Sequence, residues 1–132
     1  ELCSTIDIAP PILERAGCMP HNGIQGMSLL PSMLDPGFSG RDEILIETEH
    51  QRALFGLPYR TRMRTLQSSR YRFSIYEGAE WGELYDLEND PCECLNLWDD
   101  AKYVNLRNQL MHRLVKVMIK YSETSPNPTS QA

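Results

Sequence analysis

Three polar residues that follow a predicted strand have side chains suited to binding an anion or a hydroxyl group: Glu49, His50 and Arg52. The strand is predicted by Ile44-Leu45-Ile46, a continuous apolar run typical of a covered strand. Because loops at strand ends often hold binding residues on a rigid base, we predict that these three residues form a binding site. The alternative is a solvated turn that contains an Arg–Glu ion pair.

The other groups that could do chemistry form no recognisable centre. His21, His50 and His112 could each enter a Ser-His-Asp arrangement, but no nucleophile-elbow motif accompanies them. We expect His112 to be a surface or boundary residue of a helix. The cysteines lack the two closely spaced pairs of a structural zinc site: Cys3, Cys18, Cys92 and Cys94. We therefore predict no catalytic residue, no metal ligand and no cofactor in this chain.

Arginines alternate along one predicted strand, at Arg60, Arg62 and Arg64. We expect them to form a solvated strand face, with an anion site as the alternative. The net charge of -5 and the pI of about 5.1 argue against nucleic acid, whose phosphates need a basic face. The sequence has no run of about 18 apolar residues. It therefore predicts neither a nucleic-acid nor a membrane partner.

The predicted fold class is α+β, with an antiparallel sheet of about four strands covered by a long C-terminal helix. Apolar residues recur every three or four positions over 101–121, which predicts that helix. The connections between strands are too short for helical crossovers. In the strand at 71–76 we expect the odd positions in the core and the even positions in solvent. Strands are predicted at 44–46, 59–66, 71–76 and 83–87, with a polar turn at 67–70.

A short N-terminal helix is predicted for residues 4–16. Pro10 and Pro11 suit its first turn, and Gly17 is placed to end it. A Pro- and Gly-rich connection follows over 18–42, with one helical turn inside it.

Residues 83–97 read Glu-Leu-Tyr-Asp-Leu, two residues, Asp-Pro, one residue, Glu, two residues, Asn-Leu. This order resembles a signature near the C-terminus of the sulfatases, arylsulfatase-like members of the alkaline-phosphatase-like superfamily. Ser-Thr-Ile-Asp-Ile-Ala-Pro at 4–10 and Arg64-Thr65 with Arg70-Tyr71-Arg72-Phe73 are also similar to sulfatase segments. The resemblance covers residues 2–120, and Pro11 replaces the family's usual Thr.

The resemblance implies a sulfuric ester hydrolase that uses formylglycine and a divalent metal, calcium. Formylglycine is made in a Cys/Ser-x-Pro-x-Arg motif, and after Cys18 and Pro20 this chain carries Asn22 instead of Arg. We therefore expect a C-terminal fragment that is inactive by itself and supports a catalytic domain. Its substrate-binding residues would be Glu49, His50 and Arg52. Alternatives are a phosphatase, phosphonate hydrolase or phosphotransferase of the same superfamily, or an independent interaction module.

The chain starts at Glu1 rather than Met, and we expect it to be a piece of a longer protein. We expect residues 1–42 to belong with the missing N-terminal catalytic domain, 43–122 to form a sheet-and-helix subdomain, and 123–132 to be a flexible tail. Without the catalytic domain, apolar side chains at 4–16 and 29–34 would be exposed to solvent. We therefore expect copies of the chain to associate through this surface as a homo-oligomer. Thiols without a disulfide scaffold favour a cytoplasmic over a periplasmic or secreted protein.

Overall fold

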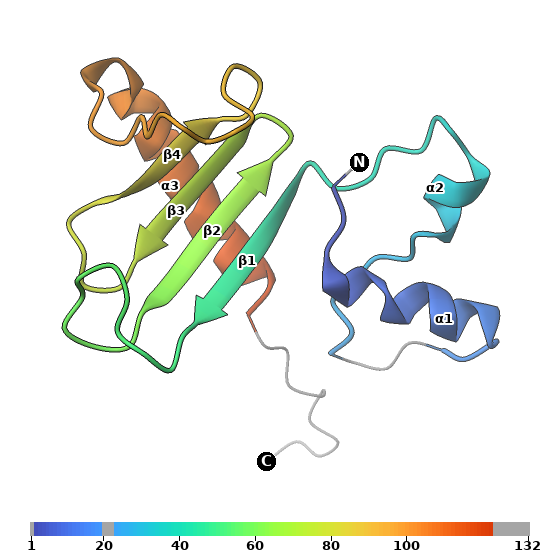
Figure 1. Ribbon diagram of the computed structural model, residues 1–132. Helices are drawn as coiled ribbons and strands as arrows, with labels where there is room; N and C mark the ends of the chain where they lie inside the picture. Colours follow the sequence, from blue (N-terminus) through green and yellow to red (C-terminus); the bar gives the residue numbers. More distant parts are fainter. Residues whose placement is uncertain (1, 20–22, 123–132) are drawn as a thin grey trace, which may run out of the picture. The chain divides into compact units, whose positions relative to one another are not determined.

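A computed structural model describes residues 2–19 and 23–122, which fall into two compact units. His21 and the tail predicted at 123–132 lie outside the described residues. One unit is Asp42–Met118, and the other joins Glu1–Arg41 to the residues from Ile119 onward. In the first unit four antiparallel strands follow one another in the sheet (Figure 1): β1 (Glu43–Glu49), β2 (Arg62–Ser68), β3 (Tyr71–Tyr76) and β4 (Gly82–Asp86).

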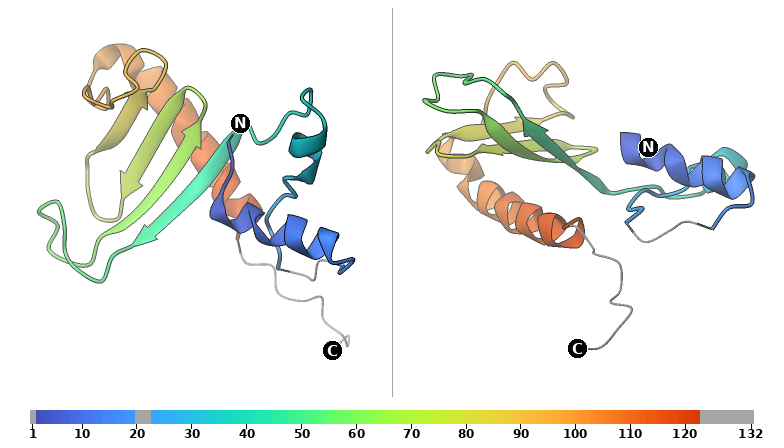
Figure 2. Two further views of the ribbon diagram at one scale, coloured as in Figure 1. Left: turned by 45° about the vertical axis from the view of Figure 1, so that its right-hand side comes forward. Right: turned by 90° about the horizontal axis from the view of Figure 1, so that it is seen from below.

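An apolar row across the sheet forms the core of this unit. Leu66, Phe73 and Leu84 are direct neighbours on β2, β3 and β4, and each is at most 1% exposed. The helix α3 (Val104–Lys120) lies along this face of the sheet (Figure 2) and buries an apolar stripe of its own: Leu110, Leu114 and Val117. Trp98 extends the core, because its ring stacks on Phe73 at 5.5 Å between centroids.

The helix predicted at 101–121 is confirmed, although its first turn is a 3-10 helix, η2 (Ala101–Tyr103). Asp100 caps it, because its side chain accepts a hydrogen bond from the Lys102 amide at 2.9 Å. The α+β class, the four-stranded antiparallel sheet and the short N-terminal helix are also confirmed.

Three details of the sheet differ from the prediction. The strand predicted from residue 59 begins at Arg62, because Thr61 is fully buried and its hydroxyl binds the loop backbone instead. The strand also runs on to Ser68, which leaves a shorter turn than the one predicted at 67–70. The face turned away from α3 was predicted to be solvated, but Ser74 and Tyr76 on that face are buried.

The second unit is held by a buried ion pair. It contains η1 (Thr5–Asp7), α1 (Ala9–Arg15) and α2 (Leu30–Leu34). Asp7 is fully buried, bonded to Arg41, and accepts hydrogen bonds from the amides of Met27 at 2.7 Å and Ser4 at 2.8 Å. Arg41 in turn donates to the Tyr121 hydroxyl. Segments far apart in the sequence therefore meet at one carboxylate.

Replacing Leu114 with Ala should lower the free energy of unfolding by about 2–5 kcal/mol, because it leaves a cavity under α3. Val115→Ala is the matched control, since Val115 is 47% exposed on the same helix and its loss should cost within about 0.5 kcal/mol. Denaturant unfolding measures both. Equal effects of the two substitutions would contradict the packing of α3 on the sheet.

Acid should destabilise the unit that contains Asp7. Burial by itself would raise the pKa of the Asp7 carboxyl, but hydrogen bonds from Arg41, Met27 and Ser4 outweigh it and hold the pKa below its usual value. Such a carboxyl stabilises the fold above its unfolded pKa of about 3.9, and this stabilisation is lost as the pH falls through the folded pKa.

We expect Asp7→Asn to remove part of this pH dependence. At neutral pH the same substitution should cost about 3–5 kcal/mol, because Arg41 is left buried without its partner. The control is Asp99→Asn at an exposed position, and unfolding curves from pH 3 to 7 provide the measurement. An unchanged pH profile in Asp7→Asn would rule out this role.

Candidate functional site

The connection between β1 and β2, residues 50–61, is a loop fixed by hydrogen bonds at its base. The His50 amide donates to the Thr61 carbonyl at 2.9 Å, and the Thr61 amide donates to the Arg52 carbonyl at 3.2 Å. The Thr61 hydroxyl also accepts from the Leu54 amide at 2.9 Å and donates to the Leu54 carbonyl at 3.3 Å. One buried threonine thus clamps the middle of the loop to its end.

The tip of this loop has an unusual backbone. Phe55 has φ 57° and Gly56 has φ 76°, so both lie in the left-handed region. This conformation is unfavourable for Phe55, because it carries a side chain. The Leu57 amide donates to the Leu54 carbonyl at 3.1 Å, and the Leu57 side chain is buried. This anchor holds the Phe55 ring at the surface.

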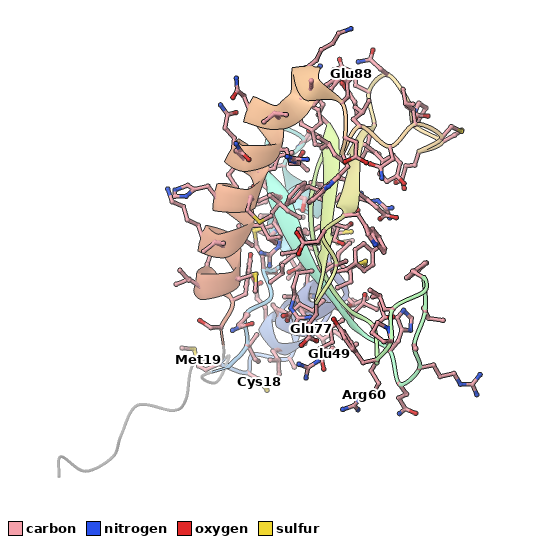
Figure 3. The ribbon with its side chains drawn as sticks, turned by 90° about the vertical axis from the view of Figure 1, so that its left-hand side faces the viewer. Cys18, Met19, Glu49, Arg60, Glu77 and Glu88 are labelled. Carbon is pink, nitrogen blue, oxygen red and sulfur yellow. The ribbon has the colours of Figure 1, made fainter. Side chains whose placement is uncertain are left out.

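The loop rises from the face of the sheet opposite α3, as Figure 3 shows from the side. Below it lies a cavity of about 230 Å³, whose lining includes rings and polar groups from the loop and from three strands. Six of the residues that line the cavity are His50, Phe55, Thr61, Arg72, Tyr76 and Glu83.

The polar part of the cavity is an ion pair that crosses β3 and β4. Arg72 Nη2 lies 3.1 Å from the Glu83 carboxylate and 3.0 Å from that of Glu93, and the guanidinium carbon lies 5.1 Å from the centroid of the Tyr85 ring. Burial, and then the charge of Glu83, raise the pKa of Tyr76, so its hydroxyl stays protonated. The cavity therefore offers donors and acceptors side by side, and the two opposite charges in its lining, those of Arg72 and Glu83, offset each other.

The structure places the three predicted site residues differently. His50 is exposed and lines the cavity. Glu49 belongs to the row that faces α3, where its carboxylate lies 3.0 Å from Arg64 and 3.7 Å from Arg62. The Arg52 side chain is exposed, with no ion pair among the described residues. Only His50 is therefore brought to the cavity.

Glu49 is part of a surface network of opposite charges. A hydrogen bond from Arg64, and then the charge of Arg62, lower the pKa of Glu49. Arg62 also pairs with Glu77, and Figure 3 shows Glu49 and Glu77 at the same end of the sheet. The predicted row of arginines is thus matched by carboxylates at Arg62 and Arg64, whereas Arg60 precedes the strand.

Comparison with known proteins decides the family. The family model for the C-terminal part of N-sulphoglucosamine sulphohydrolase matches residues 1–120. The chain belongs to this family. The predicted resemblance to the C-terminal region of a sulfatase is thereby confirmed.

Two curated relatives are sulfatases from Bacteroides thetaiotaomicron. The chain is 27% identical over 125 residues to an N-acetylglucosamine-6-O-sulfatase, a match that covers 92% of this chain and 22% of that protein. It is 27% identical over 99 residues to a Delta 4,5-hexuronate-2-O-sulfatase, covering 75% and 20%. The chain thus spans about a fifth of the length of these relatives.

A similar solved structure belongs to an enzyme named for a different activity. The phosphonate monoester hydrolase of Agrobacterium radiobacter is 26% identical, with a TM-score of 0.72 over 89% of this chain and 25% of that one. The fold of this sulphohydrolase C-terminal region therefore also occurs in an enzyme named for another ester.

Sequence reasoning about this family member found His50 but missed the residues that share its cavity. Arg72 and Tyr76 stood at positions assigned to solvent, and Glu83 at a strand end. The register of β3 with β4, which pairs Ser74 with Glu83, is what brings them together. Exposed Phe55 carried no signal in the sequence, because its backbone conformation is normally adopted by Gly or Asn.

The described residues of this family member form no metal-binding site. Across residues 2–19 and 23–122, no three His, Cys, Asp or Glu side chains are placed to hold an ion. The cysteines are free and exposed. None of the helices in these ranges is long and apolar enough to cross a membrane.

A Val side chain has nearly the same shape as Thr but no hydroxyl group. Thr61→Val should therefore remove the two hydrogen bonds that hold the loop at Leu54. The Leu54 amide and carbonyl would lose their partner, which costs about 1–3 kcal/mol. We expect faster hydrogen exchange at the Leu54 amide, measured by NMR. Thr48→Val on neighbouring β1 is the control, and comparable exchange in both variants would refute the clamp.

Proposed function

We propose that this chain is the C-terminal part of a sulfatase-like sulfuric ester hydrolase, is inactive by itself, and supports the catalytic domain. The proposal rests on the family match over residues 1–120, together with the finding that the matched residues make up only 22% and 20% of the two curated relatives. The partner is then the N-terminal catalytic domain of the same polypeptide. Both curated relatives are named for sulfated sugars, which supports a sulfated saccharide as substrate.

A second candidate is a phosphonate or phosphate ester hydrolase of the same superfamily. It is favoured by the similarity to the phosphonate monoester hydrolase. The two candidates differ in the group transferred, and nothing in the cavity beside His50 selects between sulfate and phosphonate.

The calcium and formylglycine expected for the full-length enzyme do not fit the residues of this chain. Among the described residues no three His, Cys, Asp or Glu side chains are placed to hold a cation, and the buried carboxylates of Asp7 and Asp86 are bonded to Arg41 and Arg70. Cys18 lacks the Arg of the formylglycine motif, since position 22 is Asn. We therefore assign both groups to the catalytic domain and derive no step through them.

Our proposal places Glu49, His50 and Arg52 on the side of the domain that borders the substrate entrance. His50 has the strongest support, because it combines exposure with a position on the cavity. Glu49 would act through the charge network with Arg64, and Arg52 through an exposed guanidinium. Each would contact the remote part of the substrate rather than the sulfate that reacts.

The direct test compares two esters. The isolated chain should hydrolyse neither aryl sulfates nor aryl phosphonates, and the full-length enzyme should prefer the sulfate. Metal-dependent turnover by the purified isolated chain would refute its inactivity. A preference of the full-length enzyme for the phosphonate would favour the second candidate.

In the full-length enzyme, His50→Ala should lower kcat/KM for a sulfated sugar by about 3- to 10-fold, the effect of one lost hydrogen bond. Hydrolysis of a small aryl sulfate should stay within about twofold, because that substrate does not reach the rim. His112→Ala on the exposed face of α3 is the control. Equal losses on both esters would indicate a folding defect. No loss on either ester would mean that His50 lies in a solvated turn and does not contact the substrate.

A further inference from the structure

Two aromatic rings, Phe55 and Tyr76, line the cavity beside His50, and Trp81 packs against Tyr76 outside the lining. Phe55 meets Tyr76 edge to face with 5.7 Å between centroids, and Trp81 lies tilted against Tyr76 at 4.7 Å. Tyr76 is buried, whereas Phe55 is 62% exposed and Trp81 is 38% exposed. Exposed rings gathered at the mouth of a cavity are typical of a surface that contacts a ligand.

The exposure of Phe55 is imposed by the fold. The left-handed backbone at φ 57° costs about 1–3 kcal/mol for a residue with a side chain, and the buried Thr61 and Leu57 hold it there. Such local strain is found most often at binding sites, where it presents a group in a fixed position.

The floor of the cavity is polar but nearly neutral. Arg72 uses only Nη2 in its ion pairs within the described residues, and Glu83 accepts at 3.1 Å from it. A guanidinium beside a carboxylate presents donors next to acceptors. Neighbouring sugar hydroxyls, which both donate and accept, match this pattern, whereas a bare sulfate would face the charge of Glu83.

The size of the cavity limits the ligand. At about 230 Å³ it is smaller than the 300–1,000 Å³ of sites for drug-sized molecules. This volume is on the scale of one six-membered ring, and the lining offers such a ring an aromatic face at Phe55 and polar groups at Arg72 and Glu83. An apolar protein segment would leave that ion pair without hydrogen-bonding partners, at a cost in desolvation.

We propose that the cavity between the loop 50–61 and β3–β4 binds one uncharged pyranose ring of an oligosaccharide. This inference rests on the proposed function only for the source of the saccharide, a sulfated glycan whose unsulfated residue would sit here. The binding residues are Phe55, Arg72 and Glu83, with His50 at the rim. The site would select long substrates by a sugar distant from the reacting ester.

The test is binding to the 132-residue chain, followed by NMR amide shifts. An unsulfated N-acetylglucosamine trisaccharide should shift resonances of residues 50–61 and 82–84, and sodium sulfate should not. Phe55→Ala and Glu83→Gln should each weaken binding about tenfold. Leu95→Ala, at an exposed apolar position of another loop, should bind as the unaltered chain does.

Three results would overturn the inference. These are no shift with the trisaccharide at about 50 mM, equal shifts with sulfate alone, or unchanged affinity in both Phe55→Ala and Glu83→Gln. Because Phe55 is exposed, its variant should keep the spectrum of the folded sheet, and Trp81→Ala gives a second probe of the ring surface. Binding does not require hydrolysis, so a positive result would stand even if the full-length enzyme cleaved phosphonates.

Discussion

The burial of one apolar row of the sheet beneath α3 is the contact on which the rest of the sheet-and-helix unit depends. The row consists of Leu66, Phe73 and Leu84, which are each at most 1% exposed. These side chains can be buried only if the helix lies across them. Because side chains alternate along a strand, this choice turns the neighbouring residues to the opposite face. Thr65 and Ser74 meet there, buried, with 2.8 Å between their hydroxyl oxygens. The polar cavity is thus a consequence of where the helix packs.

The sulfatase-like signature at residues 83–97 has a structural explanation. Asn96 accepts hydrogen bonds from the Leu84 and Trp98 amides at 3.0 Å each and donates to the Gly82 carbonyl at 3.0 Å. A side chain at Gly82 would come within 2.3 Å of the Trp98 ring. The signature therefore fixes the joint between the last strand and the long helix. It identifies the family through the fold rather than through a catalytic group.

The sequence predicted those parts of the fold that depend on local periodicity. The α3 stripe and the four strands follow from the spacing of apolar residues. The cavity could not be predicted, because it depends on the register between strands and on one buried hydroxyl, that of Thr61, which binds the loop backbone just before β2 begins. His50 was selected as a candidate because it follows a strand directly, and its role in binding stays a prediction. Phe55 was not, since its exposure comes from a backbone conformation without a sequence signal.

In our proposal the two ends of a substrate are recognised by different interactions, and the described part of this chain offers groups for the end remote from the reacting ester. Cleaving a sulfate ester requires a nucleophile and concentrated positive charge at the reacting group, and the described carboxylates and arginines here largely neutralise one another. A neutral ring needs instead an apolar surface beside paired donors and acceptors, which Phe55, Arg72 and Glu83 provide. Binding energy gained at such a remote point can be used to position the reacting group elsewhere. A C-terminal region of this kind could therefore change which glycan is cleaved while leaving the chemistry of cleavage to the catalytic domain.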